Sequence, residues 1–124
     1  MKRAVFLPDY RKGNPYQELL AESLATEGWN VDIQNYPAGL FPLNSVAKKY
    51  RNADVIHIHW IPPLIAKVMW AKSTPIFIFK LLLLWVDIQL MKLRGKKLVW
   101  TIHNKFSHQQ YDHRRERIIR KCLV

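Results

Sequence analysis

Three histidines stand in apolar runs of the sequence, where a strand can hold an imidazole rigidly. His57 and His59 lie in the run 54–60, and His103 ends the run 98–103. An imidazole at the end of a strand can hydrogen-bond a hydroxyl group or stabilise charge that develops during a reaction. We expect His103 to be the catalytic residue of a cleft. The same position also suits a histidine that only satisfies a neighbouring loop.

A metal site is the other chemistry that these histidines suggest. His57 and His59 share one face of a strand, because strand side chains alternate. Zinc sites usually combine tighter ligand sets with cysteine or carboxylate, and no such set appears. We therefore expect no metal and no cofactor. We expect His57 to be a satisfied core residue and His59 to face the cleft.

The apolar periodicity and the turn residues predict alternating strands and helices. The predicted strands are 4–7, a segment around Val31 and Ile33, 54–60 (broken by Pro62-Pro63), and 98–103. The first predicted helix begins at Asn14-Pro15 and ends at Gly28, with Gln17 at the capping-box position and a buried face of Tyr16, Leu19, Leu20 and Leu24. The second covers 43–50, with Leu43, Val46 and Tyr50 on one face, and the third covers 76–93, after Thr74-Pro75 and before Gly95. The last follows the pair Ser107 and Gln110 and has a buried face of Tyr111, Ile118, Ile119 and Cys122.

This order predicts an α/β fold, a three-layer Rossmann-like parallel sheet, in a single domain over 1–124. Right-handed crossovers place the first strand between the second and third, with the fourth beyond the third. A doubly wound domain normally has at least one more strand, so we expect the fold to be incomplete at its C-terminus and the protein to be truncated or split.

Ligands of open parallel sheets bind beyond the carboxyl ends of the strands. We expect the loops 9–14, 60–63 and 103–108 to converge there. The expected substrate-binding residues in and beside these loops are Gly13, Asn14, His59, Trp60, Asn104 and His108. Gly13 permits close backbone approach, and the helix after it favours an anion, although a glycine before a helix is also ordinary loop chemistry.

Two strings carry a resemblance to a known family. Asp54-Val-Ile-His-Ile-His-Trp60, and Lys97-Leu-Val-Trp-Thr-Ile-His-Asn104 followed by His108, resemble the N-terminal acceptor domain of retaining GT-B glycosyltransferases. The similarity is greatest to bacterial enzymes that build exopolysaccharide and lipid-linked oligosaccharide. It implies a hexosyltransferase in which His103 contacts the donor sugar, and in which the loop around Gly13 borders the acceptor and the donor phosphates.

The chain also departs from that family. Paired glycines are common after the family's first strand, whereas this chain has Gly13 followed by Asn14-Pro15. The resemblance places the nucleotide-sugar site and a Glu-x7-Glu element in a C-terminal domain that these 124 residues lack. It therefore implies that the donor is bound by a missing C-terminal domain or a partner chain. This chain alone would be inactive, and it would hold a lipid-linked glycan acceptor.

The segment 76–93 is apolar around most of its circumference, with Lys80, Asp87 and Arg94 on one narrow stripe. It could span a membrane, be buried by a missing domain or partner, or pack on the sheet while dipping into a membrane interface. The apolar surface with Trp70 and Trp85 favours an anionic membrane surface, because basic residues lie around it. These are Lys67, Lys72, Lys80, Lys92, Arg94, Lys96 and Lys97.

The net charge of +11 attracts polyanions, and 49% hydrophobic residues suit a globular core. The N-terminal apolar run is too short for a signal peptide, and Cys122 is the only cysteine, so we expect a cytoplasmic protein peripheral to the inner face of the plasma membrane.

Two other functions are alternatives to the acceptor-binding half of a glycosyltransferase. They are a non-catalytic membrane-anchoring subunit of a split glycosyltransferase and a basic nucleic-acid-binding module. We expect no nucleic-acid partner, because the aromatic residues are not interleaved with basic ones.

The arginine-rich cluster near the C-terminus has a simpler interpretation. We expect a solvated helix face for Arg114, Arg115, Arg117, Arg120 and Lys121.

Overall fold

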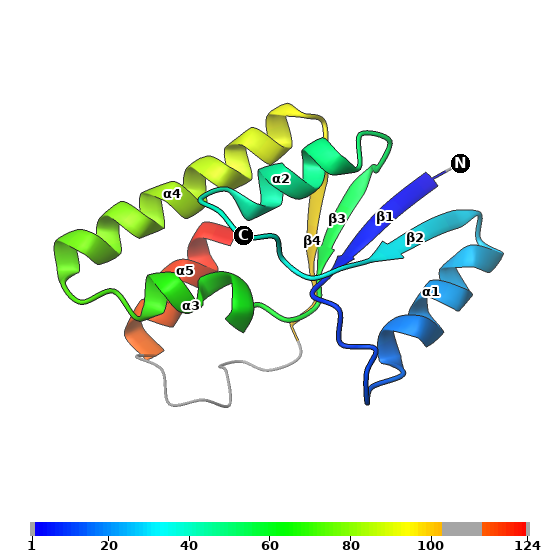
Figure 1. Cartoon of the computed structure of the whole chain (residues 1–124), viewed down its shortest axis with the longest axis horizontal. Coiled ribbons are helices and arrows are strands. Elements are labelled where there is room, and N and C mark those ends of the chain that lie inside the picture. The colour runs from blue at the N-terminus through cyan, green and yellow to red at the C-terminus, as the bar shows by residue number, and fades with distance from the viewer. Residues whose placement is uncertain (1, 103–112, 124) are drawn as a thin grey trace.

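The computed structural model describes residues 2–102 and 113–123, except for the side chains of Lys67 and His113. Strands and helices alternate along most of the described chain (Figure 1). The strands are β1 (Lys2–Leu7), β2 (Trp29–Ile33), β3 (Val55–Ile58) and β4 (Lys97–Trp100). The helices are α1 (Tyr16–Thr26), α2 (Pro42–Lys49), α3 (Pro62–Met69), α4 (Thr74–Leu93) and α5 (His113–Leu123).

The four strands form one parallel sheet in the order β2-β1-β3-β4. This is the order that the right-handed crossover rule predicts. The register pairs Val5 with Ile56 and Leu7 with Ile58. The predicted α/β class and parallel sheet are therefore confirmed, and the sheet is compatible with a Rossmann-like fold.

The two faces of the sheet meet different partners. Val5, Leu7, Ile56 and Ile58 point to one face and join a core with apolar residues of α2, α3, α4 and α5. The opposite face carries Phe6, His57 and His59, and α1 lies on that side, beside β2. Figure 1 shows α1 near β2 at one end of the molecule and the other helices near β4.

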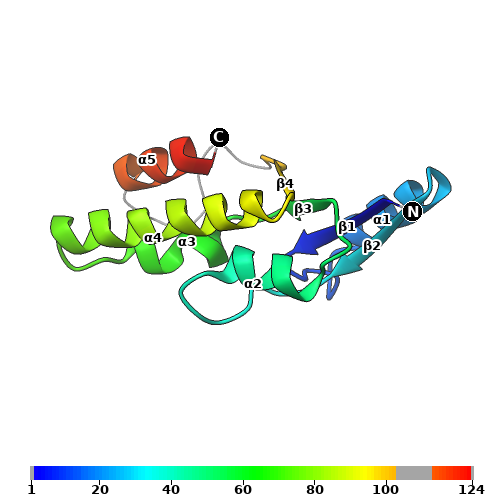
Figure 2. The same cartoon turned by 90° about the horizontal axis from the view of Figure 1, so that it is seen from above.

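Helix α4 is the centre of the helical half of the molecule. It contacts α2, α3 and α5, and the view from above places α2 and α5 on opposite sides of it (Figure 2). Ser73 caps its first turn, where the side-chain oxygen accepts from the Ile76 backbone N–H at 3.4 Å. Within residues 2–102 and 113–123, no helix is long and apolar enough to cross a membrane.

Helix α3 is not among the predicted helices. Pro62 and Pro63 end a strand in the prediction, whereas they occupy the first turn of this helix. Proline suits that turn because its missing N–H would have no partner within the helix. The predicted strands 54–60 and 98–103 are also too long, since β3 ends at Ile58 and β4 at Trp100.

The predicted buried faces of the first and last helices are partly wrong. Leu19 is 60% exposed, and Gln17 is the buried residue of α1. In α5, Ile119 is buried as predicted, but Ile118 is 40% exposed and Glu116 is buried instead. A helix can bury a polar side chain when a loop or another element supplies hydrogen bonds to it.

Candidate functional site

The carboxyl ends of three strands meet at one edge of the sheet. The backbone N–H of His59 donates to the Leu7 carbonyl at 2.8 Å, and the N–H of Thr101 donates to the Ile58 carbonyl at 2.9 Å. The segments that follow β1, β3 and β4 therefore leave the sheet side by side. This is the convergence that the doubly wound topology predicts.

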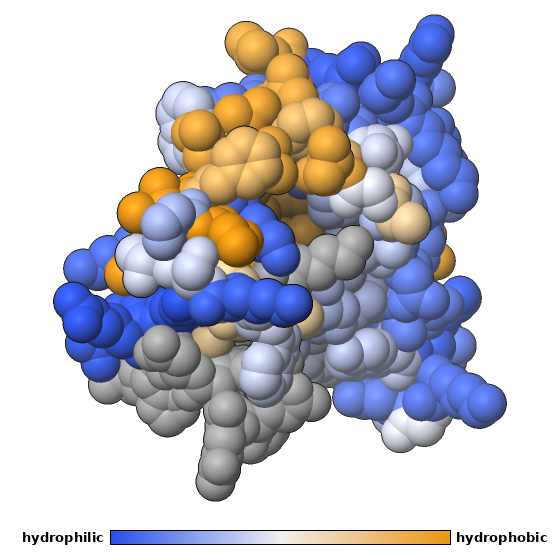
Figure 3. All heavy atoms as spheres, turned by 60° about the vertical axis from the view of Figure 1, so that its left-hand side comes forward, coloured by the Kyte–Doolittle hydropathy of each residue, from blue (hydrophilic) through white to orange (hydrophobic). Residues whose placement is uncertain are grey.

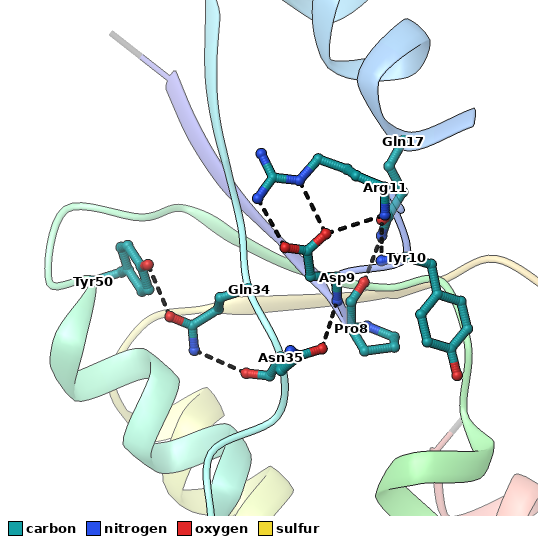
Figure 4. Close-up of polar contacts among 8 residues, drawn as sticks. All are labelled: Pro8, Asp9, Tyr10, Arg11, Gln17, Gln34, Asn35 and Tyr50. Carbon is teal, nitrogen blue, oxygen red and sulfur yellow. Dashed lines mark hydrogen bonds and ion pairs between the residues drawn. The ribbon is translucent and has the colours of Figure 1, made fainter. Parts of the chain in front are cut away.

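The loop after β1 is fixed from two sides (Figure 4). Gln17 of α1 accepts from the Tyr10 N–H at 2.9 Å and donates through Nε2 to the Pro8 carbonyl at 2.7 Å. Asn35, after β2, accepts from the Asp9 N–H at 3.1 Å. Gln17 therefore holds this loop, and the capping-box role predicted for it is wrong.

The fixed loop brings the Tyr10 ring to the end of β3. The centroids of the Tyr10 and Trp60 rings are 4.6 Å apart. Tyr16, at the start of α1, lies 6.3 Å from the Trp60 ring and 5.7 Å from the His59 ring. We call Tyr10, Tyr16 and Trp60 the aromatic cluster. Its rings offer flat apolar surfaces at the edge of the sheet where ligands of parallel sheets bind.

His57 of β3 and His59, which directly follows this strand, lie beneath this cluster. His59 is 1% exposed, and its ring stacks on that of His57 with centroids 4.0 Å apart. The Phe6 ring lies 4.4 Å from His59. We expected His59 to face an open cleft, and this is wrong because the surrounding rings cover it. His57 is half-buried and not a core residue, so that part of its prediction is wrong, but it shares the expected hydrogen bond, at 2.6 Å with the Thr101 hydroxyl.

Gly13 and Asn14 lie in the loop before α1. Gly13 has a φ of +83°, which glycine adopts most readily, and a Cβ built on it would meet no atom within 4 Å. The Asn14 side chain accepts from the Tyr16 N–H at 3.0 Å, so it orders the helix start. The first turn of α1 also carries Glu18, which works against an anion at this helix end.

The expected catalytic residue His103, and the expected substrate-binding residues Asn104 and His108, lie outside the described residues. The same holds for Ser107, Gln110 and Tyr111, which were predicted to begin and line the last helix. Gly13, Asn14, His59 and Trp60 are the site candidates that the structure describes, and they lie in or beside the converging segments.

Tyr10 of the aromatic cluster also lines a pocket of about 750 Å³. Its wall comes from the β1–α1 loop, the β2–α2 loop, α3 and α4. The lining residues are Pro8, Tyr10, Asn35, Tyr36, Pro37, Ala38, Gly39, Leu40, Pro42, Pro63, Leu64, Val68, Phe79, Lys80, Leu83, Leu84 and Asp87. Sequence reasoning missed this pocket, because its residues come from four separate segments.

Tyr36 joins the pocket wall to the aromatic cluster. Its hydroxyl donates to the Trp60 carbonyl at 3.0 Å, which ties the β2–α2 loop to the end of β3. Burial raises the pKa of the Tyr36 hydroxyl well above its ordinary value, so it remains a hydrogen-bond donor at neutral pH. The pocket and the aromatic cluster therefore share a common wall.

Helix α4 buries one polar side chain, that of Asp87. The Asp87 carboxylate accepts from the backbone N–H groups of Leu43 and Asn44, at 2.9 and 2.7 Å. Asp87 thus caps the N-terminus of α2 from a distant part of the sequence. Burial raises the pKa of Asp87 to about 6, although both backbone hydrogen bonds lower it. Arg94 lies on the same side and donates to the Asn44 side chain at 2.7 Å.

The opposite side of α4 is exposed and apolar. It carries Ile78, Phe79, Leu82 and Trp85, each with at least 49% of its surface exposed. Figure 3 shows apolar side chains gathered over this helix, with hydrophilic residues beside them. We call these four residues the exposed face of α4. Apolar patches of this kind mark surfaces that bind a partner or a membrane.

Two basic residues, one near α4 and one in α5, bind backbone carbonyls of this chain. Lys96 was expected at the rim of the apolar surface, but it is buried and donates to the carbonyls of Arg51 and Ala53. Arg115 donates to the Met69 and Ala71 carbonyls, which clamps α5 to the end of α3. The solvated face predicted for the arginine cluster is therefore wrong for this residue.

Among the described residues, no group of three or more histidine, cysteine or acidic side chains is placed to hold a metal ion. The chain matches no protein-family model, no curated protein and no solved structure. The chemistry of the site therefore follows from its own residues, which offer aromatic surfaces beside an apolar pocket at the carboxyl edge of a parallel sheet.

Proposed function

We propose that this chain is the acceptor-binding half of a GT-B glycosyltransferase, which moves a sugar from a nucleotide-sugar donor to a lipid-linked glycan acceptor. The donor binds to a C-terminal domain or a partner chain. His103 serves the reacting centre, and the aromatic cluster holds the acceptor sugar. The protein's contribution to such a reaction is mainly positioning of the reactants and stabilisation of charge on the leaving phosphate.

The aromatic cluster is the observation that carries the proposal. Sugars present flat apolar faces that stack on aromatic rings, and polar edges that hydrogen-bond. Tyr10 and Trp60 lie 4.6 Å apart at a sheet edge where ligands of this fold class bind. Because Gln17 and Asn35 fix the Tyr10 loop, the rings need little reorganisation when a ligand arrives.

Saccharide binding tests this proposal. A panel of methyl glycosides and disaccharides is added to the protein, and saturation transfer from protein to sugar protons is measured by NMR. We expect transfer for at least one sugar, and we expect Tyr10→Ala and Trp60→Ala to abolish it. Trp70→Ala is the matched control, because this exposed tryptophan lies outside the aromatic cluster. Equal transfer in the Trp60→Ala and Trp70→Ala proteins would refute the assigned site.

The exposed face of α4 supports a second component, peripheral docking on an anionic membrane. Phe79, Leu82 and Trp85 would enter the interface, and the exposed lysines Lys72 and Lys92 would lie near the headgroups. This surface also suits the alternative of a non-catalytic anchoring subunit. Saccharide binding at the aromatic cluster separates the two, because an anchoring subunit needs none.

Liposome flotation tests the docking. We expect the protein to float with vesicles that contain anionic lipid and to bind zwitterionic vesicles more weakly. The double variant Phe79→Ser with Trp85→Ser should lower the floated fraction at least about tenfold, since two buried aromatic contacts are lost. Leu19→Ser is the control, because Leu19 is an equally exposed apolar residue on α1. Recovery of the double variant at the wild-type level would exclude α4 as the membrane contact.

A further inference from the structure

The pocket between the β2–α2 loop, α3 and α4 has the size of a small-molecule site. Its volume of about 750 Å³ lies within the range of ligand pockets in proteins. Most of its wall is apolar, and the side chains of Leu64, Val68, Leu83 and Leu84 contribute to it. The apolar part of this wall favours a hydrocarbon, because the contact removes apolar surface from water.

The pocket is continuous with two other surfaces. Leu40 and Phe79, which are 69% and 60% exposed, line it and also belong to the apolar exterior. Tyr10 lines it as well and packs against the tilted Trp60 ring in the aromatic cluster. A molecule in the pocket could therefore extend from the exposed face of α4 to the converging ends of β1 and β3.

The pocket wall carries one basic side chain, that of Lys80, and one acidic side chain, that of Asp87. Lys80 contributes a positive charge on a long, flexible side chain. Asp87 also lines the wall, but both of its carboxylate oxygens accept backbone N–H groups of α2. The acid is therefore directed at the helix N-terminus, and Lys80 supplies the cation at this wall.

We infer that this pocket binds the single hydrocarbon chain of a phosphorylated lipid, with the phosphate at Lys80 and the remainder of the molecule directed toward Tyr10 and Trp60. The inference rests on the proposed function for the identity of this lipid as the glycan carrier. The pocket supplies the apolar contact for the chain, and Lys80 supplies the electrostatic contact for the phosphate.

Calorimetric titration with dodecyl phosphate below its micellar concentration tests the inference, with dodecanol and inorganic phosphate as separate arms. We expect dodecyl phosphate to bind at one site. Ala38→Trp places an indole in the pocket from an exposed loop position and should weaken binding at least about tenfold. Lys80→Gln should weaken dodecyl phosphate about fivefold and leave dodecanol unchanged.

Two matched variants control for general effects. Ala25→Trp adds the same indole at an exposed position of α1, and Lys92→Gln removes a lysine of α4 that does not line the pocket. Both should bind dodecyl phosphate as the wild type does, and circular dichroism checks that all four variants fold. Wild-type affinity in the Ala38→Trp protein would overturn the inference. So would tighter binding of inorganic phosphate than of dodecyl phosphate.

A fourth arm separates a carrier lipid from a membrane phospholipid. Short-chain diacyl phosphatidate carries the same phosphate on two chains, and tighter binding of it than of dodecyl phosphate would overturn the single-chain assignment. The outcomes also separate this inference from the proposed function. Loss of chain binding with saccharide transfer intact removes only the pocket inference, whereas chain binding without saccharide transfer removes only the proposed function.

Discussion

The two sides of helix α4 are both largely apolar, and they differ in what covers them. The packed side joins the core with residues such as Leu84, and it also holds Asp87, which hydrogen-bonds α2. The side that faces outward contains Ile78, Phe79, Leu82 and Trp85. A surface helix of a globular domain normally buries its apolar stripe and exposes its polar one.

This comparison teaches that the buried acid of α4 serves the neighbouring helix α2. The N-terminal N–H groups of α2 need acceptors, and Phe41 at its N-cap position has no side chain that accepts. Asp87 takes that role at 2.7 and 2.9 Å. The outward apolar residues have no such internal role, which is why they are interpreted as a contact surface.

The largest expected effect is a loss of stability, and it separates two leucine variants, one on each side of the helix. Leu84 is 6% exposed and joins the core, whereas Leu82 is 54% exposed. Leu84→Ala should lower the free energy of unfolding by about 2–4 kcal/mol, since it leaves a cavity. Leu82→Ala should change it by less than about 0.5 kcal/mol. Urea denaturation measures both, and equal losses would mean that the exposed face is buried in solution.

A somewhat smaller effect is expected from removal of the buried acid. Asp87→Ala leaves the Leu43 and Asn44 N–H groups without their acceptor. The free energy of unfolding should fall by about 2–3 kcal/mol, which combines a lost helix cap with two unsatisfied buried donors. Gln89→Ala on the same helix is the control. If both variants unfold at the same urea concentration, Asp87 does not cap α2.

The smallest of the three effects is a pH dependence. The pKa of Asp87 is about 6 in the folded protein, above its ordinary value of 3.8. The folded state therefore holds the proton more tightly, so this stabilisation is complete below about pH 4 and is lost as the pH rises through 6. The wild type should lose about 1–2 kcal/mol of stability between pH 4 and 7 relative to Asp87→Asn, which does not titrate. A constant difference between the two proteins would contradict the raised pKa.

The local sequence determined the class of the fold and most of its elements. Apolar strand runs, Gly28 and Gly95 after helices, and Thr74-Pro75 at the start of a helix are each signals that span only a few residues. The crossover rule then fixed the order β2-β1-β3-β4, because handedness follows from chain geometry and not from the particular side chains. The sequence also placed Trp60 at the edge where the strands converge.

Only the tertiary structure decided which side chains meet. Gln17 reads as a capping residue by its spacing, yet it bonds Pro8 and Tyr10 because the loop folds back onto α1. Asp87 is predicted only as part of a narrow polar stripe, yet it accepts from the Leu43 N–H, 44 positions away in the chain. Periodicity describes one element alone, whereas burial depends on what packs against it, and the pocket beside Tyr10 exists only because four distant segments surround it.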